Sequence, residues 1–195
     1  MKSFNQFDVY FTFPDTFNED IYGKIPNNAT HVILGRDFNT KITPGSFPEG
    51  TKYIKFGRYF NKTVNNCFPS TLIGLEFGDY FDQEIKSCIP YGVKYLKFGH
   101  LFRKSINNYI PDTVIHLTLG CFYDKDIIKL PRSVNYLKIG HGFKSKISDN
   151  VLINLETLIF GGNYNINTIK HVDNIINNYC FNNDSKCILD STYYL

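Results

Sequence analysis

Long apolar segments are missing from this sequence. No run of 18 apolar residues occurs in its 195 positions, which excludes a membrane-spanning helix of the usual length. The opening residues, MKSFNQFDVYFTF, also lack the apolar core and the small-residue cleavage site of a secretory signal peptide. We therefore expect a soluble intracellular protein that is not secreted and does not bind membranes.

Strong charge and recognisable catalytic motifs are missing as well. The net charge of +3 is too small to imply nucleic-acid binding, since proteins that bind phosphate backbones concentrate many cations on one face. The sequence contains no G-x-S-x-G, P-loop, H-E-x-x-H or C-x-x-C motif, and its five histidines are scattered. These absences predict that the chain is not an enzyme and carries no cofactor.

What the sequence does contain is a repeat of about 21 residues. The repeat is marked by seven glycines: Gly35, Gly57, Gly78, Gly99, Gly120, Gly140 and Gly161. A proline stands nine residues before each of the first six glycines: Pro26, Pro48, Pro69, Pro90, Pro111 and Pro131. An aromatic residue stands three residues after every glycine: Phe38, Phe60, Phe81, Phe102, Tyr123, Phe143 and Tyr164. Such spacing is typical of a solenoid, in which each repeat forms one coil.

Each coil contains one short stretch with the alternation of a half-buried strand. In the coil around Gly99, the inward positions of this stretch are Leu96 and Phe98. Equivalent strands of successive coils would pair in parallel about 4.8 Å apart, and the aromatic residues would stack as a ladder in the core. The pattern predicts a β-rich solenoid of about eight coils. A three-sided parallel β-helix is the alternative, because 21 residues leave little room for a convex helix.

The start of the chain departs from the repeat but keeps its outline. Residues 1–24 carry an imperfect copy of the repeat, with Phe11 and Phe13 at the strand positions. This pattern predicts an N-terminal capping coil, followed by regular coils over residues 25–168. We expect one solenoid domain spanning residues 1–195, because repeats that contact only their neighbours need atypical coils at both ends.

The end of the chain, residues 169–195, shows a different periodicity. Five apolar residues recur at helical spacing: Ile169, Val172, Ile175, Ile176 and Tyr179. This spacing predicts an amphipathic helix that closes the open end of the core. The segment 187–195 is expected to add an edge strand.

With these columns in view, the coils resemble the FNIP repeat, a relative of the leucine-rich repeat in proteins of amoebal giant viruses and slime moulds. The matching pairs are Phe17-Asn18, Phe38-Asn39 and Phe60-Asn61, and the resemblance covers about residues 4–168. It implies a leucine-rich-repeat-like fold and a role in binding other proteins, in the cytoplasm of the host or of the source cell. Some viral members also carry an F-box module that recruits ubiquitin ligases, but we expect none ahead of the first coil here.

The outward strand positions form the candidate binding surface. They lie four and two residues before each glycine, and every second coil places a tyrosine and a lysine there. The pairs are Tyr53 with Lys55, Tyr95 with Lys97 and Tyr136 with Lys138. A basic aromatic strip of this kind predicts a protein partner, in particular an acidic one from the host. Glu76 and Asp79 interrupt the strip, which weighs against nucleic acid.

The same strip has a simpler interpretation. Duplication of a two-coil unit would also place tyrosine and lysine in alternate coils, where they would only solvate an exposed sheet. Beside the leading interpretation as a non-catalytic interaction module, two other functions stay open. One is a self-assembling structural protein, and the other is a ligase-adaptor-like substrate receptor without its own F-box.

Two further columns combine residues with reactive side chains. In the first column, four such residues directly follow the glycines of consecutive coils: Asp79, His100, Cys121 and His141. Side chains in a parallel ladder point the same way and do not converge on one ion, so we predict no metal site. Cys67 and Cys88 share a column on the back of the solenoid, where oxidation could link them. In a reducing cell we expect both to be free thiols.

Overall fold

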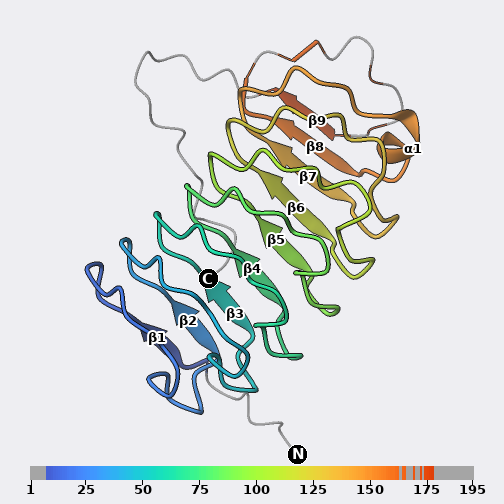
Figure 1. Cartoon of the computed structure of the whole chain (residues 1–195). Helices are drawn as coiled ribbons and strands as arrows, with labels where there is room; N and C mark the ends of the chain where they lie inside the picture. Colours follow the sequence, from blue (N-terminus) through green and yellow to red (C-terminus); the bar gives the residue numbers. More distant parts are fainter. Residues whose placement is uncertain (1–7, 163, 166–168, 170–171, 173, 178–195) are drawn as a thin grey trace, which may run out of the picture.

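The computed structural model describes residues 8–162, 164–165, 169, 172 and 174–177, which form one elongated stack of coils (Figure 1). Each coil contributes one short strand, and the nine strands pair in chain order into a single sheet. The strands are β1 (Tyr10–Thr12), β2 (His31–Ile33), β3 (Tyr53–Lys55), β4 (Gly74–Glu76), β5 (Tyr95–Lys97), β6 (His116–Leu119), β7 (Tyr136–Ile139), β8 (Thr157–Phe160) and β9 (Asn174–Asn177). The helix found in this part of the chain, α1, spans Asp149–Leu152.

All neighbouring strands are parallel and pair equivalent positions of the repeat. Tyr53 pairs with Gly74 and Gly74 with Tyr95, so residues of one sequence column lie side by side across the sheet. The predicted capping coil joins the same sheet, because Phe11 of β1 pairs with Val32 of β2. The β-rich solenoid is thereby confirmed. Outside the named strands, the described residues add one bridge, Ile127 with Ile147, so they do not form a three-sided β-helix.

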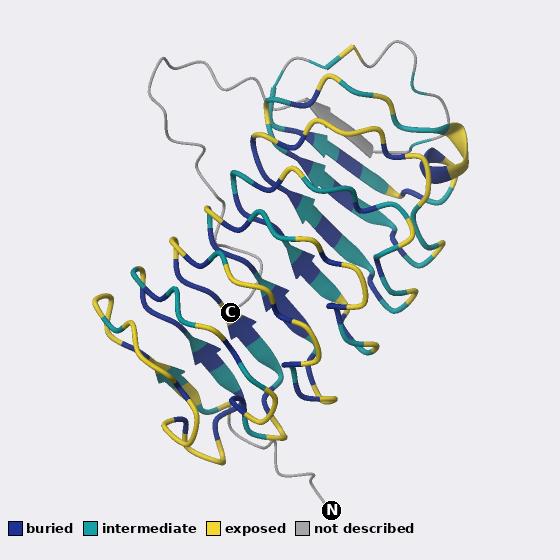
Figure 2. Ribbon diagram, viewed as in Figure 1, coloured by how far each residue is buried: buried dark blue, intermediate teal, exposed yellow. Residues whose placement is uncertain are grey.

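The core lies behind the sheet, and two of its columns contain stacked aromatic rings. In Figure 2, buried and more exposed positions alternate along the strands. Phe102 is fully buried and stacks between Phe81 and Tyr123, with ring centroids 6.2 Å away on each side. It also faces Phe98 of its own coil at 4.0 Å. The predicted aromatic ladder is therefore present, and a second column of strand phenylalanines packs against it.

The prolines and glycines of the repeat mark the turns at the two ends of each strand. In the coil before β6, the N–H of Val114 donates to the carbonyl of Pro111 at 3.1 Å, which closes a turn of four residues. At the other end, a Cβ atom on Gly99 would overlap the carbonyl of Gly78 in the preceding coil. Only glycine allows the coils to approach this closely.

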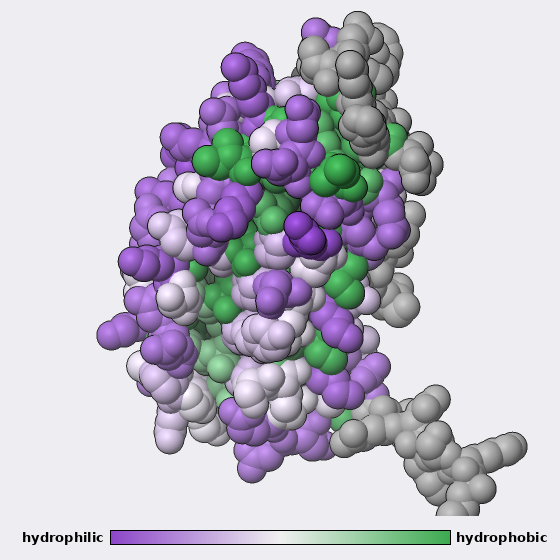
Figure 3. Space-filling model, turned by 90° about the vertical axis from the view of Figure 1, so that its right-hand side faces the viewer, coloured by the Kyte–Doolittle hydropathy of each residue, from purple (hydrophilic) through white to green (hydrophobic). Residues whose placement is uncertain are grey.

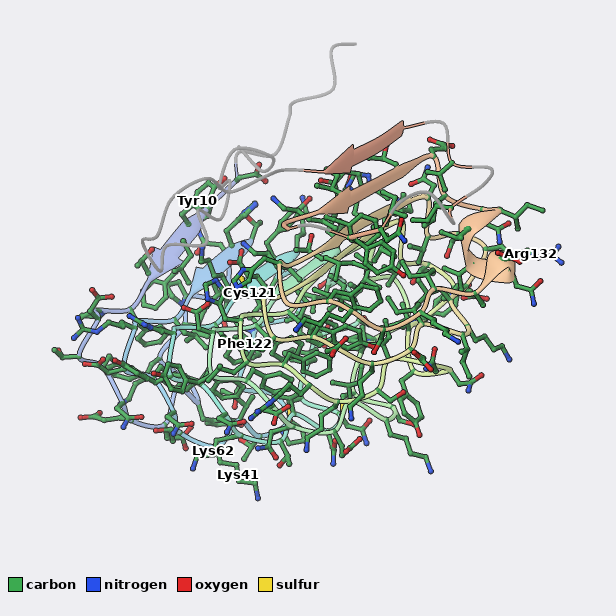
Figure 4. The ribbon with its side chains drawn as sticks, turned by 90° about the horizontal axis from the view of Figure 1, so that it is seen from above. Tyr10, Lys41, Lys62, Cys121, Phe122 and Arg132 are labelled. Carbon is green, nitrogen blue, oxygen red and sulfur yellow. The ribbon has the colours of Figure 1, made fainter. Side chains whose placement is uncertain are left out.

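A ladder of polar side chains joins the coils on the side opposite the sheet. In four successive coils, the backbone N–H that follows the core aromatic donates to the side-chain oxygen at the same position of the preceding coil, at 2.8 to 3.0 Å. The residues in this ladder are Asn18, Asn39, Asn61, Asp82 and Arg103. Lys41 and Lys62, in the turns beyond it, lie on the far side of the coils from β8 and β9, whereas Arg132 extends on the flank that carries α1 (Figure 4).

The predicted C-terminal helix is wrong. Residues 174–177, at the centre of that segment, form strand β9, in which Ile175 pairs with Leu158 of β8 and Ile176 pairs with Ile159. The backbone groups on the free edge of β8 need hydrogen-bond partners, and β-branched isoleucines favour an extended strand that supplies them. Tyr179 and the predicted edge strand at 187–195 lie outside the described residues.

Candidate interaction surface

The six predicted site residues lie in two adjacent rows on the outward side of the sheet, which we call the strand face. Tyr53, Tyr95 and Tyr136 share the row four residues before the coil glycines. Lys55, Lys97 and Lys138 share the row two residues before them. Because one coil separates successive pairs, the tyrosines stand about 10 Å apart along the stack. What the intervening coils place between them determines the character of the surface.

Histidines fill the positions between the tyrosines and complete a stacked aromatic row. The ring of His31 stacks on Tyr10 at 4.3 Å and on Tyr53 at 4.5 Å, with interplanar angles of 24° and 12°. Farther along, His116 stacks on Tyr136 at 4.9 Å and meets Tyr95 edge to face at 5.2 Å. We name these six rings the aromatic row: Tyr10, His31, Tyr53, Tyr95, His116 and Tyr136.

Gly74 stands in the middle of this row and makes room for one of its rings. A Cβ atom at Gly74 would overlap Cδ1 of the Tyr53 ring, so that ring lies over the backbone of β4. Burial raises the pKa of the Tyr53 hydroxyl, and the neighbouring Tyr95 raises it further. The two triplets of rings thus approach each other across a coil that contributes no side chain to this row.

The two histidines of the aromatic row are held in their neutral form. Burial lowers the pKa of His31, and the charge of Asp8 opposes this shift in part. Burial also lowers the pKa of His116. Nδ1 of His31 lies 2.9 Å from the hydroxyl of Thr30, close enough for a hydrogen bond that orients the ring. Near neutral pH the aromatic row therefore carries no charge of its own.

Beside the aromatic row runs a charged row. Its acidic member is Glu76, whose Oε1 accepts from Nζ of Lys97 at 2.9 Å and lies 3.3 Å from Nζ of Lys55. Lys55 keeps 51% of its side-chain surface exposed, whereas Lys97 keeps only 22%. No described acidic residue pairs with Lys138. One carboxylate therefore contacts two of the three predicted lysines, and the third has no acidic partner among the described residues.

A second set of apolar side chains lies at the corner where the chain leaves the strands, two residues after the glycines. It comprises Tyr59, Tyr80, Leu101 and Phe122, of which Phe122 is 53% exposed. Tyr59 and Tyr80 contact each other at 5.0 Å. The guanidinium of Arg58 lies over both rings at 5.8 and 5.9 Å. We call this set the corner row.

Two other parts of the described surface are the flank of α1 and one hollow. The flank that carries α1 shows apolar side chains scattered among hydrophilic ones (Figure 3). A hollow of about 380 Å³ is lined by Asn108, Ile110, Lys129, Leu130 and Pro131. Lys129 supplies the one ionisable side chain of this lining, so the hollow brings together no acid–base pair.

The column of potential metal ligands does not form a site in the described residues. Nε2 of His100 lies 3.9 Å from Oδ1 of Asp79, which is too far for a hydrogen bond. Cys121 is 1% exposed, whereas His141 points outward beside Phe122. In the same part of the chain, no three His, Cys, Asp or Glu side chains are placed to hold one ion.

Cys67 and Cys88 are buried free thiols on the back of the solenoid. The thiol of Cys88 donates to the side-chain oxygen of Asn65 at 2.9 Å, and that of Cys67 donates to the backbone carbonyl of Asn65 at 3.1 Å. Burial raises the pKa of both thiols, which keeps them protonated and unreactive.

Sequence reasoning identified the tyrosines and lysines but missed half of the aromatic row. Tyr10, His31 and His116 were assigned no role, although they occupy the column that contains the three tyrosines. The corner row was missed as well. Its signal was the exposed position directly before each core aromatic, which holds a large apolar residue in four consecutive coils.

Comparison with known proteins identifies the repeat. The profile of the family described as FNIP Repeat matches residues 17–59, 38–80, 60–99 and 81–122, which together cover more than half of the chain. The chain belongs to the FNIP repeat family. The Phe-Asn pair of the repeat now has a structural meaning, because the phenylalanine supplies a ring of the core and the asparagine a rung of the polar ladder.

A solved structure places this FNIP repeat protein among the leucine-rich-repeat folds. That solved structure is of CroV588, a circular leucine-rich-repeat protein from a giant virus, to which this chain is similar. CroV588 is 31% identical to this chain, with a TM-score of 0.79 over 88% of it, and the chain spans 27% of the length of CroV588. No curated protein matches the sequence. None of the described helices is both long and apolar enough to cross a membrane.

Proposed function

We propose that the chain is a non-catalytic interaction module that binds an acidic protein of the host cell through its strand face. The observation that carries this proposal is the aromatic row. Its six rings form two triplets along one face, and in each triplet a histidine ring contacts a tyrosine on both sides, which restricts the motion of these side chains. Tyrosine is enriched at the energetic centres of protein interfaces, since it buries a large area with few rotatable bonds.

The charges beside the aromatic row favour an acidic partner. Five lysines lie on or next to the strand face: Lys52, Lys55, Lys94, Lys97 and Lys138. Glu76 neutralises part of this charge, and a net positive surface remains. It would attract an acidic partner and repel a second copy of itself, so stacking of two copies through this face is disfavoured. The acidic residues Glu76 and Asp79 would also repel a continuous phosphate backbone.

A pull-down from a lysate of the host tests the proposal. The bait is the intact chain, compared with a triple variant in which Tyr53, Tyr95 and Tyr136 are replaced by alanine. A matched control replaces Tyr22 and Tyr91, two exposed tyrosines away from the strand face, by alanine. Circular dichroism establishes that all three chains fold. Capture is repeated at two salt concentrations, since an acidic partner should bind less tightly at the higher one.

We expect a partner that the wild type and the Tyr22/Tyr91 control capture and the folded triple variant loses. A partner captured equally by all three chains would contradict a role for the strand face. If no partner is captured and light scattering shows a particle size that grows with concentration, the self-assembling structural protein becomes the better explanation.

A further inference from the structure

Glu76 is the one residue of the strand face whose charge opposes the proposed partner. It stands in β4, directly between Lys55 of β3 and Lys97 of β5 in the paired register. Its carboxylate contacts both ammonium groups, at 3.3 and 2.9 Å. In the same coil Gly74 contributes no side chain to the aromatic row, so Glu76 is the outward side chain that β4 presents.

We propose that Glu76 acts as an internal competitor for the partner, so that its carboxylate occupies the place between Lys55 and Lys97 that a partner carboxylate would take. This inference rests on the proposed function, because it concerns the same face and the same acidic partner. It assigns Glu76 the role of a specificity residue, which sets how acidic a partner must be before it binds.

The geometry allows the competition to be reversible. About a quarter of the Glu76 side-chain surface is exposed, and Lys55 is half exposed, so a partner can reach this ion pair from solvent. Ion pairs at such partly exposed positions contribute little net stability, because water and salt screen them. A partner carboxylate can therefore displace Glu76 from Lys55 without disturbing the strand, whereas the more buried Lys97 keeps its hydrogen bond.

The C-terminal half of the strand face lacks such a competitor. Between Lys97 and Lys138 the charged row holds Thr118, a neutral residue, and no described acidic residue contacts Lys138. The stack of His116 on Tyr136 lies beside it. An acidic partner thus meets a cation next to aromatic rings at this end that no described carboxylate contacts, and at the other end two cations that share the single carboxylate of Glu76. Binding should begin near Lys138 and extend toward Lys55 only if the partner supplies enough negative charge.

A fluorescein-labelled hexaglutamate peptide serves as the probe, and hexaglutamine is its neutral control. Fluorescence anisotropy measures binding to the wild type, to Glu76→Gln and to Glu49→Gln. Glutamine keeps the shape of Glu76 and removes its charge. Glu49 is an exposed glutamate in a turn that contacts Ser70, so its variant has the same net charge without altering the strand face. A fourth variant, Lys138→Met, tests the open end.

We expect Glu76→Gln to bind hexaglutamate roughly three- to fivefold more tightly than the wild type, the change that corresponds to removal of one surface ion pair. Glu49→Gln should stay within about twofold of the wild type, and Lys138→Met should bind more weakly. Binding by Glu76→Gln where the wild type shows none would support the inference equally.

Two results would overturn it, and they differ in what they leave standing. If the wild type binds hexaglutamate but not hexaglutamine, and Glu76→Gln binds no more tightly, the competitor role fails while the acidic-partner proposal survives. If neither chain prefers hexaglutamate even at low salt, the acidic-partner proposal fails together with the competitor role.

Discussion

The side-chain oxygen of Asn39 accepts a hydrogen bond from the backbone N–H of Asn61, 22 residues later in the chain, at 2.9 Å. Asn39 itself donates its backbone N–H to the side chain of Asn18 in the coil before. Each rung therefore uses the side chain of one coil and the backbone of the next. Asp82 continues the ladder because a carboxylate oxygen accepts as well as an amide oxygen does, and it receives the N–H of Arg103.

Replacement of Asn39 should separate the need for an acceptor from the need for an amide. Asn39→Ala leaves the N–H of Asn61 without its partner and should cost about 1–2 kcal/mol of the free energy of unfolding. Asn39→Asp keeps an acceptor and should cost clearly less. Urea denaturation of the three chains measures both values. Equal losses in the two variants would mean that the amide NH2 group, and not the acceptor oxygen, stabilises the turn.

The core ladder predicts a sharp contrast between two phenylalanines one coil apart. Phe102 is fully buried between stacked rings, whereas Phe122 is about half exposed in the corner row. Phe102→Ala should cost about 3–5 kcal/mol, since it leaves a cavity and removes ring contacts. Phe122→Ala should cost less than about 1 kcal/mol. Thermal unfolding followed by circular dichroism compares the two, and similar losses would contradict the assignment of core and surface.

Gly74 in strand β4 and Gly99 in the turn after β5 should respond differently to the same added methyl group. Gly99→Ala would push against the backbone carbonyl of Gly78, which cannot move without separating the coils, and should cost about 1–3 kcal/mol. Gly74→Ala would push against the ring of Tyr53, a side chain that can rotate away, and should cost less than about 1 kcal/mol. Urea midpoints of the two variants test this order. A larger loss for Gly74→Ala would show that the aromatic row is a major source of stability.

The partly buried histidines His31 and His116 predict a loss of stability in mild acid. Because the folded chain lowers the pKa of His31 and His116, the unfolded chain takes up protons first as the pH falls below about 6.5. Stability contributed by the neutral rings is present above that pH and is lost toward the lower pKa values of the folded state.

The measurement is the melting temperature at pH 7.5 and pH 5.5, for the wild type and for a His31→Phe/His116→Phe variant. Phenylalanine keeps a ring at each position and does not titrate. The melting temperature of the wild type should fall further between pH 7.5 and pH 5.5 than that of the variant. The other histidines are the same in both chains, so what they contribute is common to the two measurements. An equal loss in both would show that the two histidines are not the groups responsible.

The path of the coils could be predicted because each column holds one kind of residue for one physical reason. Proline occupies the turn before the strand, glycine the point where two coils approach, and phenylalanine the core. The C-terminal helix was predicted wrongly because Ile175 and Ile176 fit a helical spacing and a short strand equally well. The deciding factor is the unpaired edge of β8, which no local pattern reveals.

The candidate surface was only half predictable for a similar reason. The alternation of Tyr53, Tyr95 and Tyr136 is visible in the sequence, but His31 and His116 attract attention only as isolated histidines until the register aligns them with the tyrosines. The link from Glu76 to two lysines depends on side-chain rotamers, which the sequence does not specify. The repeat columns in the sequence predict which residues lie side by side in adjacent coils, and only the structure shows which of their side chains are in contact.

The glycine column has a consequence for how such a chain can change length. Each glycine approaches the glycine of the coil before it, from Gly57 on Gly35 to Gly120 on Gly99. The surface that a coil presents to the preceding coil therefore fits the surface that it presents to the next one. An in-frame duplication or deletion of one 21-residue unit would join surfaces that already match, and no compensating substitution would be required. The chain can thus be lengthened or shortened in whole coils while its outward side chains diversify.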